Sequence, residues 1–410
     1  MRVALKQSKV ISGSNITITG SKSESNRLLL LQALYPHLEI SNVSNSDDSQ
    51  LMQKALHNDS DLVDIHHAGT AMRFLTAYFS IQPNREVTLT GSSRMQERPI
   101  KILVDALREL GADIQYEKNE GFPPLRIKGN ASLRNKVTMK ANVSSQYISA
   151  LLLIGSKLKE GITLHLEGEI TSVPYIEMTL ELLRKLEIKT SFVGNTIQVQ
   201  PKETEVKDVT IVVESDWSSA SYFYSCVALS EVGSTICLSS YRSNSLQGDS
   251  SLIEFYEAFG VETSFNEHQI VLTKVEDVLP NTKIAFDLSN SPDLAQTISV
   301  TCLGLGLPCH LTGLHTLKIK ETDRLIALQN EIEKFGTRVD ITDSELSIDQ
   351  PKDLLKDVAV DTYKDHRMAM AFAPLALKTS LVVNDADVVS KSYPDFWQDM
   401  SKVGIEVLEF

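Results

Sequence analysis

The chain has 410 residues, 42% of them hydrophobic and 23% charged, and its formal net charge is -13. These values are ordinary for a folded globular protein and argue against disorder, and the negative charge argues against a nucleic-acid partner, which needs a basic surface. A chain of this length exceeds one ordinary core, so we expect two domains or a repeated architecture.

The cysteines and the N-terminus indicate a cytosolic protein. Cys226, Cys237, Cys302 and Cys309 lie among apolar residues without paired metal-ligand spacing, which is typical of reduced, buried thiols. The N-terminus lacks the apolar stretch and cleavage site of a signal peptide, and the apolar run 28–34 is too short to span a bilayer. We therefore expect a complete, cytoplasmic protein.

One pattern recurs along the chain at intervals of roughly 70 residues, after a shorter first copy. In each copy, small polar residues precede a helix that is apolar nearly all round, which predicts a buried helix with a polar N-terminal end. The starts of these helices are Ser23 to Arg27, His67 to Ala71, Ser144 to Gln146, Asp216 to Ser219, Ser291 to Asp293, and Asp365 to Arg367.

Short strands and amphipathic helices follow these buried helices. Alternating or wholly apolar short runs are typical of strands, and a glycine just after an apolar-periodic run suits a helix C-cap, which needs a left-handed residue. We expect strands at 87–90, 112–116, 162–166, 338–341 and 381–383, and amphipathic helices at 102–110 and 253–259 that end at Gly111 and Gly260. The alternation of strand and helix predicts an α/β organisation.

The stretch Lys-Ile-Lys-Glu-Thr-Asp-Arg near residue 320 predicts a helix start that carries chemistry. Thr322 or Asp323 can cap the first turn, and the positive end of the helix dipole then favours an anion. Lys320 and Arg324 would flank Glu321, so these cations can tune the pKa of its carboxyl group. A carboxylate among cations suits proton transfer near a phosphate; the alternative is an ordinary charged first turn.

The stretch Gly20 to Arg27 joins a flexible glycine, several hydroxyl groups and two cations at a helix start, which suits phosphate or carboxylate binding. It lacks the glycine spacing of a P-loop. If several such starts face one cleft, their partial positive charges add, and an acidic protein can hold doubly charged phosphates there. The alternative is that the repeats serve packing only.

Together these blocks give the chain a resemblance to the 5-enolpyruvylshikimate-3-phosphate synthase family along essentially its whole length. So many separate blocks in the family's order make the match specific. The stretches that carry it are Gly20 to Arg27, Ala68 to Arg73, Arg94 to Ile100, Ser144 to Gln146, Asp216 to Ser221, Lys320 to Arg324, Asp365 to Met370, and Lys391 to Asp395.

The resemblance implies an α/β fold of two similar domains. Each domain would consist of three repeated βαβαββ units with buried parallel helices, an arrangement called an inside-out α/β barrel. The chain would cross between the domains twice, near Thr17 to Gly20 and near Asp216. Residues 1–17 together with 216–410 are then expected to form one domain, and residues 18–215 the inserted domain.

The resemblance also implies an activity: transfer of the enolpyruvyl group of phosphoenolpyruvate to the 5-hydroxyl of shikimate 3-phosphate, with release of phosphate. This is a step of the shikimate pathway toward chorismate and the aromatic amino acids. In this family, addition is followed by elimination through a tetrahedral intermediate, and a cleft closes between two domains, which excludes water. The resemblance implies no metal, no organic cofactor and a monomer. The negative charge and the lack of a spanning apolar run already predict no nucleic-acid and no membrane partner.

Individual site residues follow from the positions that match the family's motifs. For shikimate 3-phosphate the matching residues are Lys22, Ser23, Arg27, Ser144, Ser145, Gln146, Ser172, Tyr175, Asp293 and Lys320. For phosphoenolpyruvate they are Lys22, Gly69, Arg98, Gln146, Arg324, Arg367 and Lys391. Arginine forks suit bidentate binding of carboxylates and phosphates, so this composition is physically sensible.

Three residues are expected to be catalytic. Asp293 corresponds to the family's proposed base for the attacking 5-hydroxyl, Glu321 to the group that handles the proton at the methylene carbon, and Lys22 to a cation near both substrates. A base and an acid in one cleft need pKa values that their surroundings push apart. His366 is either functional or a packed, hydrogen-bonded histidine.

Two positions depart from the family pattern. His67 stands where the family usually has asparagine before Ala-Gly-Thr, and Thr316 stands where many members have another asparagine. Both side chains can still form hydrogen bonds, so the contacts made there are in question rather than the activity.

Two alternative functions stay open. The related transferase that acts on UDP-N-acetylglucosamine usually carries a reactive cysteine shortly before an Arg-Pro pair, whereas here Ser92 to Met95 precedes that pair and the first cysteine is Cys226. A catalytically silent protein that binds phosphorylated molecules would keep the cations but lose an acid-base residue. Asp293, Glu321 and Lys22 are all present.

Overall fold

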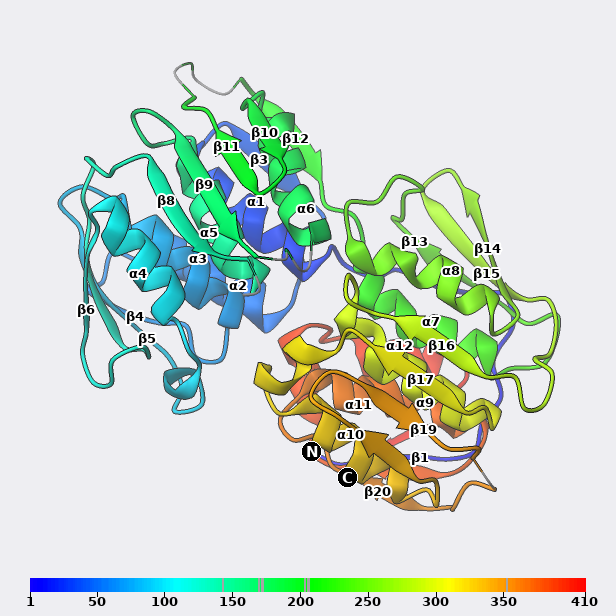
Figure 1. The fold of residues 1–410 in the computed structure, drawn as a ribbon. Helices are drawn as coiled ribbons and strands as arrows, with labels where there is room; N and C mark the ends of the chain where they lie inside the picture. The colour runs from blue at the N-terminus through cyan, green and yellow to red at the C-terminus, as the bar shows by residue number, and fades with distance from the viewer. Residues whose placement is uncertain (142–143, 169, 171–172, 203, 205–206, 352) are drawn as a thin grey trace. The chain divides into compact units, whose positions relative to one another are not determined.

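The computed structural model describes residues 1–141, 144–168, 170, 173–202, 204, 207–351 and 353–410. The chain forms two compact units. Figure 1 colours the chain by residue number, from blue at the N-terminus to red at the C-terminus. Unit 1 consists of Met1–Thr19 and Glu214–Phe410, and unit 2 of Gly20–Val213. These divisions lie two residues from the expected crossings; that each unit folds as an independent domain stays a prediction.

Unit 2 alternates strands and helices along the chain. Its strands are β3 (Leu38–Ser41), β4 (Leu62–Asp64), β5 (Glu86–Thr90), β6 (Asp113–Tyr116), β7 (Leu125–Lys128), β8 (Lys136–Lys140), β9 (Ile162–Glu167), β10 (Thr190–Val193), β11 (Thr196–Val199) and β12 (Val209–Val212). Its helices are α1 (Lys22–Leu34), α2 (Asp47–Leu56), α3 (Gly69–Ser80), α4 (Lys101–Leu110), α5 (Ser145–Gly155) and α6 (Val173–Lys185).

Unit 1 repeats the alternation. Its strands are β1 (Val3–Leu5), β2 (Ser14–Ile16), β13 (Thr235–Ser239), β14 (Val261–Asn266), β15 (Gln269–Lys274), β16 (Ile284–Asp287), β17 (Cys309–Thr312), β18 (Val339–Ile341), β19 (Leu346–Ile348), β20 (Val358–Val360), β21 (Leu381–Val383) and β22 (Val407–Glu409). Its α-helices are α7 (Trp217–Ala228), α8 (Leu252–Glu257), α9 (Ala295–Leu305), α10 (Arg324–Glu333), α11 (His366–Phe372) and α12 (Phe396–Lys402).

The sheets share one topology. In the order β4-β5-β7-β6, the strands β4 and β5 pair in parallel across helix α3, and the later hairpin of β6 and β7 adds antiparallel to β5. The same pairing occurs in β10-β11-β9-β8, β14-β15-β13-β2, β16-β17-β19-β18 and β20-β21-β1-β22, although in the last of these β1 and β22 come from opposite ends of the chain and form no hairpin. Strand β3 pairs with β12 in parallel. The strands expected at 87–90, 112–116, 162–166, 338–341 and 381–383 are therefore confirmed as β5, β6, β9, β18 and β21.

The N-terminal segment completes two sheets of unit 1. Strand β1 lies between β21 and β22 and is antiparallel to both, while β2 pairs in parallel with β13. Residues more than 400 positions apart in the chain are thus paired, and the backbone N–H groups of Arg2 and Phe410 each donate to the other residue's carbonyl oxygen. The final repeat therefore depends on the first residues of the chain.

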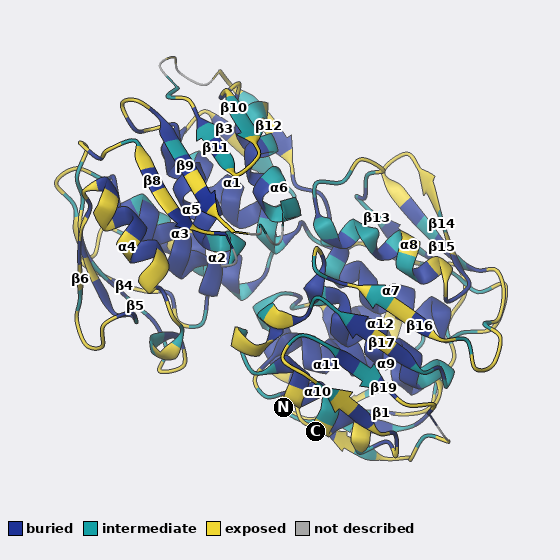
Figure 2. Ribbon diagram, in the orientation of Figure 1, coloured by how far each residue is buried: buried dark blue, intermediate teal, exposed yellow. Residues whose placement is uncertain are grey.

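Each unit has its apolar helices inside and its sheets outside. Every residue of α11 is buried, and so are all residues of α7 except Ser218 and all residues of α3 except Tyr78. Figure 2 shows these helices mostly in dark blue, while strands at the surface alternate between buried and exposed residues. This is the inside-out α/β arrangement expected for the fold, and it leaves the polar helix starts at the ends of the core helices.

The helix end expected at Gly111 is confirmed, whereas the one expected at Gly260 is not: α8 ends at Glu257 with Ala258 as its C-cap. Helix α4 is followed by Gly111 in the left-handed region, with φ 102°, and its backbone N–H bonds to the last turn. A side chain at this φ would be strained, which explains the glycine. None of the helices in the described ranges is both long and apolar enough to cross a bilayer.

Candidate active site

Helix α10 of unit 1 begins where the charged stretch near residue 320 predicts. Asp323 is the N-cap, and its carboxylate accepts from the backbone N–H groups of Leu325 and Ile326 at 3.1 and 3.3 Å. The cap fixes the start of the helix, so Arg324 is its first residue, and its side chain is buried. Glu321 lies one turn earlier, within reach of the same guanidinium.

Arg324 is the centre of a carboxylate cluster. Its buried guanidinium donates to Asp365 Oδ2 at 2.7 Å, to Asp293 Oδ1 at 2.8 Å and to Glu321 Oε2 at 3.0 Å. Burial alone lowers the pKa of a guanidinium, but the three carboxylates outweigh burial and raise the pKa of Arg324. Arg324 is therefore a permanent charge, and it holds side chains from the starts of three helical segments together.

Asp293 lies in the 3-10 helix η3 (Pro292–Leu294) that leads into α9, and it contacts two further cations. Arg367 Nη2 lies 3.0 Å from Asp293 Oδ2, and Lys320 Nζ lies 3.3 Å from Asp293 Oδ1. The pairing differs in one respect from the sequence expectation: Lys320 forms an ion pair with Asp293, whereas Arg324 pairs with Glu321. The expected base is thus bound by three cations at once.

Asp249 belongs to the same cluster, although the sequence analysis missed it. It is buried, and it accepts a hydrogen bond from the Ser218 hydroxyl, which in turn lies 3.1 Å from Arg367 Nη2. Burial, reinforced by the charge of Asp293, raises the pKa of Asp249 to about 6. A carboxyl group whose pKa is raised toward neutral pH in this way is a recognised mark of a functional site. Its local sequence, Gln-Gly-Asp at the start of the 3-10 helix η2 (Gly248–Ser251), carries no distinctive signal.

The remaining expected residues of unit 1 lie at neighbouring segment ends. Lys391 ends the 3-10 helix η6 (Ala386–Lys391), and its ammonium donates to the backbone oxygen of Lys364 at 2.7 Å. His366 is the first residue of α11; it is buried, and its Nδ1 lies 3.9 Å from Asp365 Oδ1. The Thr316 hydroxyl is buried without a hydrogen-bond partner among the described residues.

In unit 2, Arg27 of helix α1 links three helices. Its guanidinium donates to the hydroxyls of Thr179 on α6 and Ser149 on α5, and to the backbone oxygens of Ser23 and Tyr175, at 2.8 to 3.3 Å. All four of these acceptors are neutral. Burial lowers the pKa of Arg27 to about 10, an effect that Tyr175 and Glu24 partly oppose. A buried cation bonded to neutral acceptors favours a site for an anionic ligand group.

Gly69, the first residue of α3, permits the close approach of Arg98. A Cβ atom at this glycine would lie 2.5 Å from Arg98 Nη1 and 3.0 Å from Arg98 Cζ, so the guanidinium occupies the space that a side chain would fill. The buried Nε atom of Arg98 has no hydrogen-bond partner among the described residues. The start of α3 and this guanidinium together present N–H donors to an anion.

The start of α5 is joined to the start of α3. Ser144 caps α5, its hydroxyl accepting from the backbone N–H of Gln146, and the Gln146 amide donates to the Thr70 hydroxyl at 3.2 Å. Ser145 is the first residue of the helix. The structure thus brings these expected residues to the same end of unit 2 as Arg98. Ser172, another expected residue, lies outside the described residues.

Lys22, the first residue of α1, contacts a carboxylate that the sequence analysis did not single out. Its ammonium lies 3.8 Å from Asp48 Oδ2 on α2. Asp48 also lies 3.7 Å from the Nε2 atom of His67. In a protein with 53 acidic residues, only the folded neighbourhood distinguishes Asp48 from the others.

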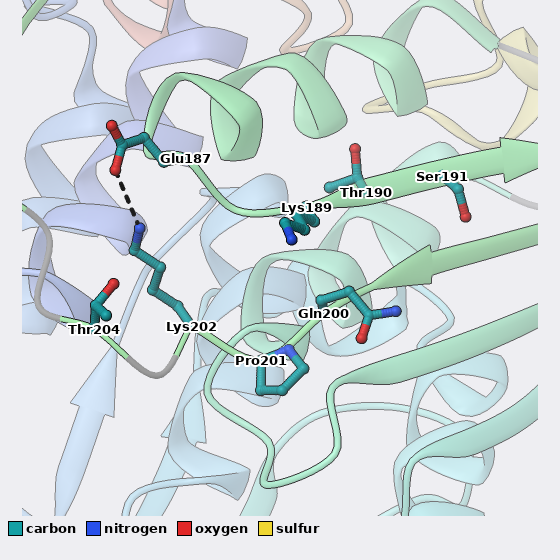
Figure 3. Close-up of a pocket in the computed structure, with 8 residues that line it drawn as sticks. All are labelled: Glu187, Lys189, Thr190, Ser191, Gln200, Pro201, Lys202 and Thr204. Atoms are coloured by element: carbon teal, nitrogen blue, oxygen red, sulfur yellow. Dashed lines mark ion pairs between the residues drawn. The ribbon is translucent and has the colours of Figure 1, made fainter.

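A hollow elsewhere in unit 2 is not part of this site. It has a volume of about 670 Å³, and none of the expected residues that the structure describes lines it. Figure 3 shows Lys202 reaching across it toward Glu187, 3.5 Å away. Its lining residues are Glu187, Lys189, Thr190, Ser191, Gln200, Pro201, Lys202 and Thr204. Among the described residues, no three histidine, cysteine, aspartate or glutamate side chains are grouped so as to hold a metal ion.

Repeated α/β units around buried helices, with cations and carboxylates gathered at the helix starts, define an enolpyruvyl transferase fold. It is similar to that of EPSP synthase from Acinetobacter baumannii, with a TM-score of 0.81 and 19% identity over 100% of both chains. It is also similar to that of the enolpyruvyl transferase NikO from Streptomyces tendae, with a TM-score of 0.74 and 15% identity over 99% of this chain and 98% of the other.

The amino-acid sequence identifies the family. Residues 58–400 match the family model described as EPSP synthase (3-phosphoshikimate 1-carboxyvinyltransferase). A 3-phosphoshikimate 1-carboxyvinyltransferase of Bacteroides fragilis is 47% identical over 96% of both chains, and one of Shewanella pealeana is 33% identical over 98% of this chain and 99% of the other. The chain belongs to the EPSP synthase family.

Proposed function

We infer that the chain is a transferase that moves the carboxyvinyl group of phosphoenolpyruvate onto the 5-hydroxyl of shikimate 3-phosphate and releases phosphate. The observation that carries this inference is the identity of 47% with a 3-phosphoshikimate 1-carboxyvinyltransferase over almost the whole of both chains. The cluster around Asp293 supports it, because it combines a carboxylate with fixed cations. Such a set suits proton transfer next to phosphate and carboxylate groups.

The chemistry requires three proton transfers. In the addition step, the 5-oxygen of shikimate 3-phosphate bonds to C2 of phosphoenolpyruvate, its proton leaves, and a proton joins the methylene carbon. In the elimination step, the bond between C2 and the bridging phosphate oxygen breaks, and a proton leaves the new methyl group to restore the double bond. No oxidation or reduction occurs, so acid-base groups and charge stabilisation suffice.

We assign the proton transfers to Asp293 and Glu321. Asp293 accepts the proton of the 5-hydroxyl, and its contacts with Arg324, Arg367 and Lys320 hold the carboxylate in one orientation. Glu321 donates a proton to the methylene carbon and takes it back in the elimination step. Its contact with Arg324, at 3.0 Å, links its position to that of Asp293.

We assign shikimate 3-phosphate to the residues gathered at the helix starts of unit 2, together with two residues of unit 1. Arg27 suits an anionic group because its own hydrogen bonds go to neutral acceptors. The hydroxyl-bearing starts of α1 and α5 suit a phosphate. The proposed set is Lys22, Ser23, Arg27, Ser144, Ser145, Gln146, Ser172, Tyr175, Asp293 and Lys320.

We assign phosphoenolpyruvate to Lys22, Gly69, Arg98, Gln146, Arg324, Arg367 and Lys391. This substrate carries a carboxylate and a phosphate, and arginine forks bind both groups in a bidentate manner. Arg98 is the best supported member, since its buried Nε atom lacks a hydrogen-bond partner among the described residues. Lys22 is placed beside the departing phosphate, where its positive charge stabilises the developing negative charge.

The test is the release of phosphate from phosphoenolpyruvate with and without shikimate 3-phosphate, in metal-free buffer. We expect release only when both substrates are present, and loss of turnover in Glu321→Gln while both substrates still bind. Turnover with UDP-N-acetylglucosamine as acceptor would instead favour the related transferase, and binding by calorimetry without release would favour a silent binding protein. A monomeric, cytoplasmic protein is also proposed; light scattering tests the first and cell fractionation the second.

A further inference from the structure

Two adjacent histidines at the start of α3 are hydrogen-bonded to each other. The Nδ1 atoms of His66 and His67 lie 2.8 Å apart, and the two rings meet edge to face. His66 has a left-handed backbone, with φ 47°, and its N–H donates to Asp64 Oδ1 at 2.8 Å. Because a side chain at positive φ carries a conformational cost, the surrounding contacts hold this turn in place.

The other nitrogen of His67 faces two carboxylates in the first turn of α2. Its Nε2 atom lies 3.7 Å from Asp48 Oδ1 and 3.9 Å from Asp47 Oδ2. The side chain of Asp48 is only 10% exposed, and its second oxygen, Oδ2, lies 3.8 Å from the ammonium of Lys22. One carboxylate therefore lies between the imidazole of His67 and the ammonium of Lys22.

The short distance between the histidines limits how many protons they hold. Two nitrogen atoms at 2.8 Å need one donor and one acceptor, so a single proton lies between the Nδ1 atoms. The pair can take up one further proton, on an Nε2 atom, without losing this hydrogen bond. The pair can therefore be neutral or carry a single positive charge.

We propose that His67 is a positioning residue for Lys22. His67 acts through Asp48, and its effect depends on whether the His66–His67 pair carries an additional proton. When the pair is neutral, Asp48 is available to the Lys22 ammonium and holds it back. When the pair is positive, its charge competes for Asp48 and frees Lys22 to meet the phosphate of the substrate. This inference rests on the proposed function, in which Lys22 contacts both anionic substrates.

The charged groups that face this network come from several elements. In the contacts above they are Lys22 from α1, Asp47 and Asp48 from α2, Asp64 from β4 and the two histidines, while Arg98 contacts Gly69, two residues beyond His67. Asparagine at position 67, the residue usual in the family, also forms hydrogen bonds, but it cannot take up a proton. Replacing His67 by asparagine thus removes the imidazole that faces Asp48 and keeps a polar side chain.

The experiment compares His67→Asn with the natural chain from pH 5.5 to pH 8. The ratio of KM for phosphoenolpyruvate, variant over natural chain, is expected to rise roughly three- to ten-fold as the pH falls, the effect of one unit charge at protein-surface distances. The kcat ratio is expected to vary much less. His57→Asn is the matched control: His57 is exposed at the C-terminal end of α2, and its ratio is expected to stay flat.

Two further variants test whether His67 acts through Asp48. In an Asp48→Asn background, His67→Asn is expected to have no pH-dependent effect, because the shared carboxylate is gone. His67→Gln repeats the test should asparagine impair folding. A flat KM ratio in both His67 variants, or a persistent pH effect in the Asp48→Asn background, would overturn the proposal.

Calorimetry keeps this test independent of turnover. The affinity for phosphoenolpyruvate in the presence of shikimate 3-phosphate, measured over the same pH range, is expected to show the same change in ratio. If the natural chain binds both substrates without releasing phosphate, the proposed activity fails while the binding ratios still decide the role of His67. If it turns over and the ratios are flat, only the role of His67 fails.

Discussion

The guanidinium of Arg324 lies 2.8 Å from the carboxylate of Asp293, and both belong to helix starts that are far apart in the sequence. Arg324 also forms an ion pair with Asp365, which is fully buried. Separating the members of this cluster would expose a charge to solvent or leave one buried without its partner. The pair therefore places a proton acceptor in a fixed position beside cations that suit the substrate's anionic groups.

Asp293→Asn tests this acceptor. An amide cannot take the proton of the 5-hydroxyl, so kcat should fall roughly 10²- to 10⁴-fold. Because the substitution also frees Arg324, Arg367 and Lys320 from a competing carboxylate, the affinity for phosphoenolpyruvate should not decrease. Steady-state kinetics and calorimetry measure the two effects, with the exposed Asp340→Asn on β18 as the control. A variant with natural kcat would show that Asp293 is not the base.

Arg27→Lys tests the proposed contact with shikimate 3-phosphate. A lysine keeps the charge but loses the fork that reaches Thr179, Ser149 and Tyr175. We expect KM for shikimate 3-phosphate to rise roughly ten-fold or more, equivalent to the loss of a charge-assisted hydrogen bond, with a much smaller change for phosphoenolpyruvate. Arg134→Lys, at an exposed position, is the control. An equal rise for both substrates would argue for a general structural effect.

Gly69→Ala tests the approach of Arg98. The added methyl group would lie 2.5 Å from Arg98 Nη1, so the end of this side chain must move while the backbone can stay. KM for phosphoenolpyruvate should rise about ten-fold, and thermal stability should not fall, because alanine is favoured over glycine within a helix. Adding Gly69→Ala to Arg98→Ala should then change KM little further. Full additivity of the two effects would contradict the proposed mechanism.

The pKa of Asp249 predicts a pH-dependent stability. It is raised from 3.8 to about 6 by burial, so the folded state holds the proton more tightly than the unfolded state. The stabilisation from this group is therefore full below about pH 4 and is lost as the pH rises to about 6. In Asp249→Asn this loss is absent, so the difference in Tm, variant minus natural chain, should increase between pH 4 and pH 7. A constant difference would mean that Asp249 titrates normally.

Residues 20–213 alone should fold, because every strand of unit 2 pairs within that range. A fragment of these residues should show α/β circular dichroism and a cooperative thermal transition. An unfolded fragment, or free proteolysis within the same range in the full chain, would show that the unit is not an independent domain.

The repeat and the buried helices could be predicted because they depend on local patterns. A helix that is apolar on all sides is buried wherever it lies in the fold. A glycine such as Gly111 after a helical pattern indicates a left-handed residue at the helix C-terminus before any tertiary contact is known. The place of strand β1 between β21 and β22 could be expected only from the family resemblance, since it depends on pairing across almost the whole chain.

The site was predictable at its cations and less so at its supporting carboxylates. Lys22, Arg27 and Arg324 stand in distinctive motifs at helix starts. Asp48 and Asp249 do not, and their importance comes from distances to Lys22 and Ser218 that only folding creates. An aspartate in a turn or a first helical turn is usually a cap, so its sequence context does not distinguish a structural role from a functional one.

The most direct test of the proposed reaction follows the bridging oxygen of phosphoenolpyruvate. In addition and elimination, the bond between C2 and this oxygen breaks, so ¹⁸O placed at the bridge must leave in the released phosphate. The account predicts that ³¹P NMR shows labelled phosphate, formed only with shikimate 3-phosphate and in step with a carboxyvinyl ether at its 5-oxygen. Unlabelled phosphate with the label in pyruvate would show cleavage of the P–O bond and contradict the assigned chemistry.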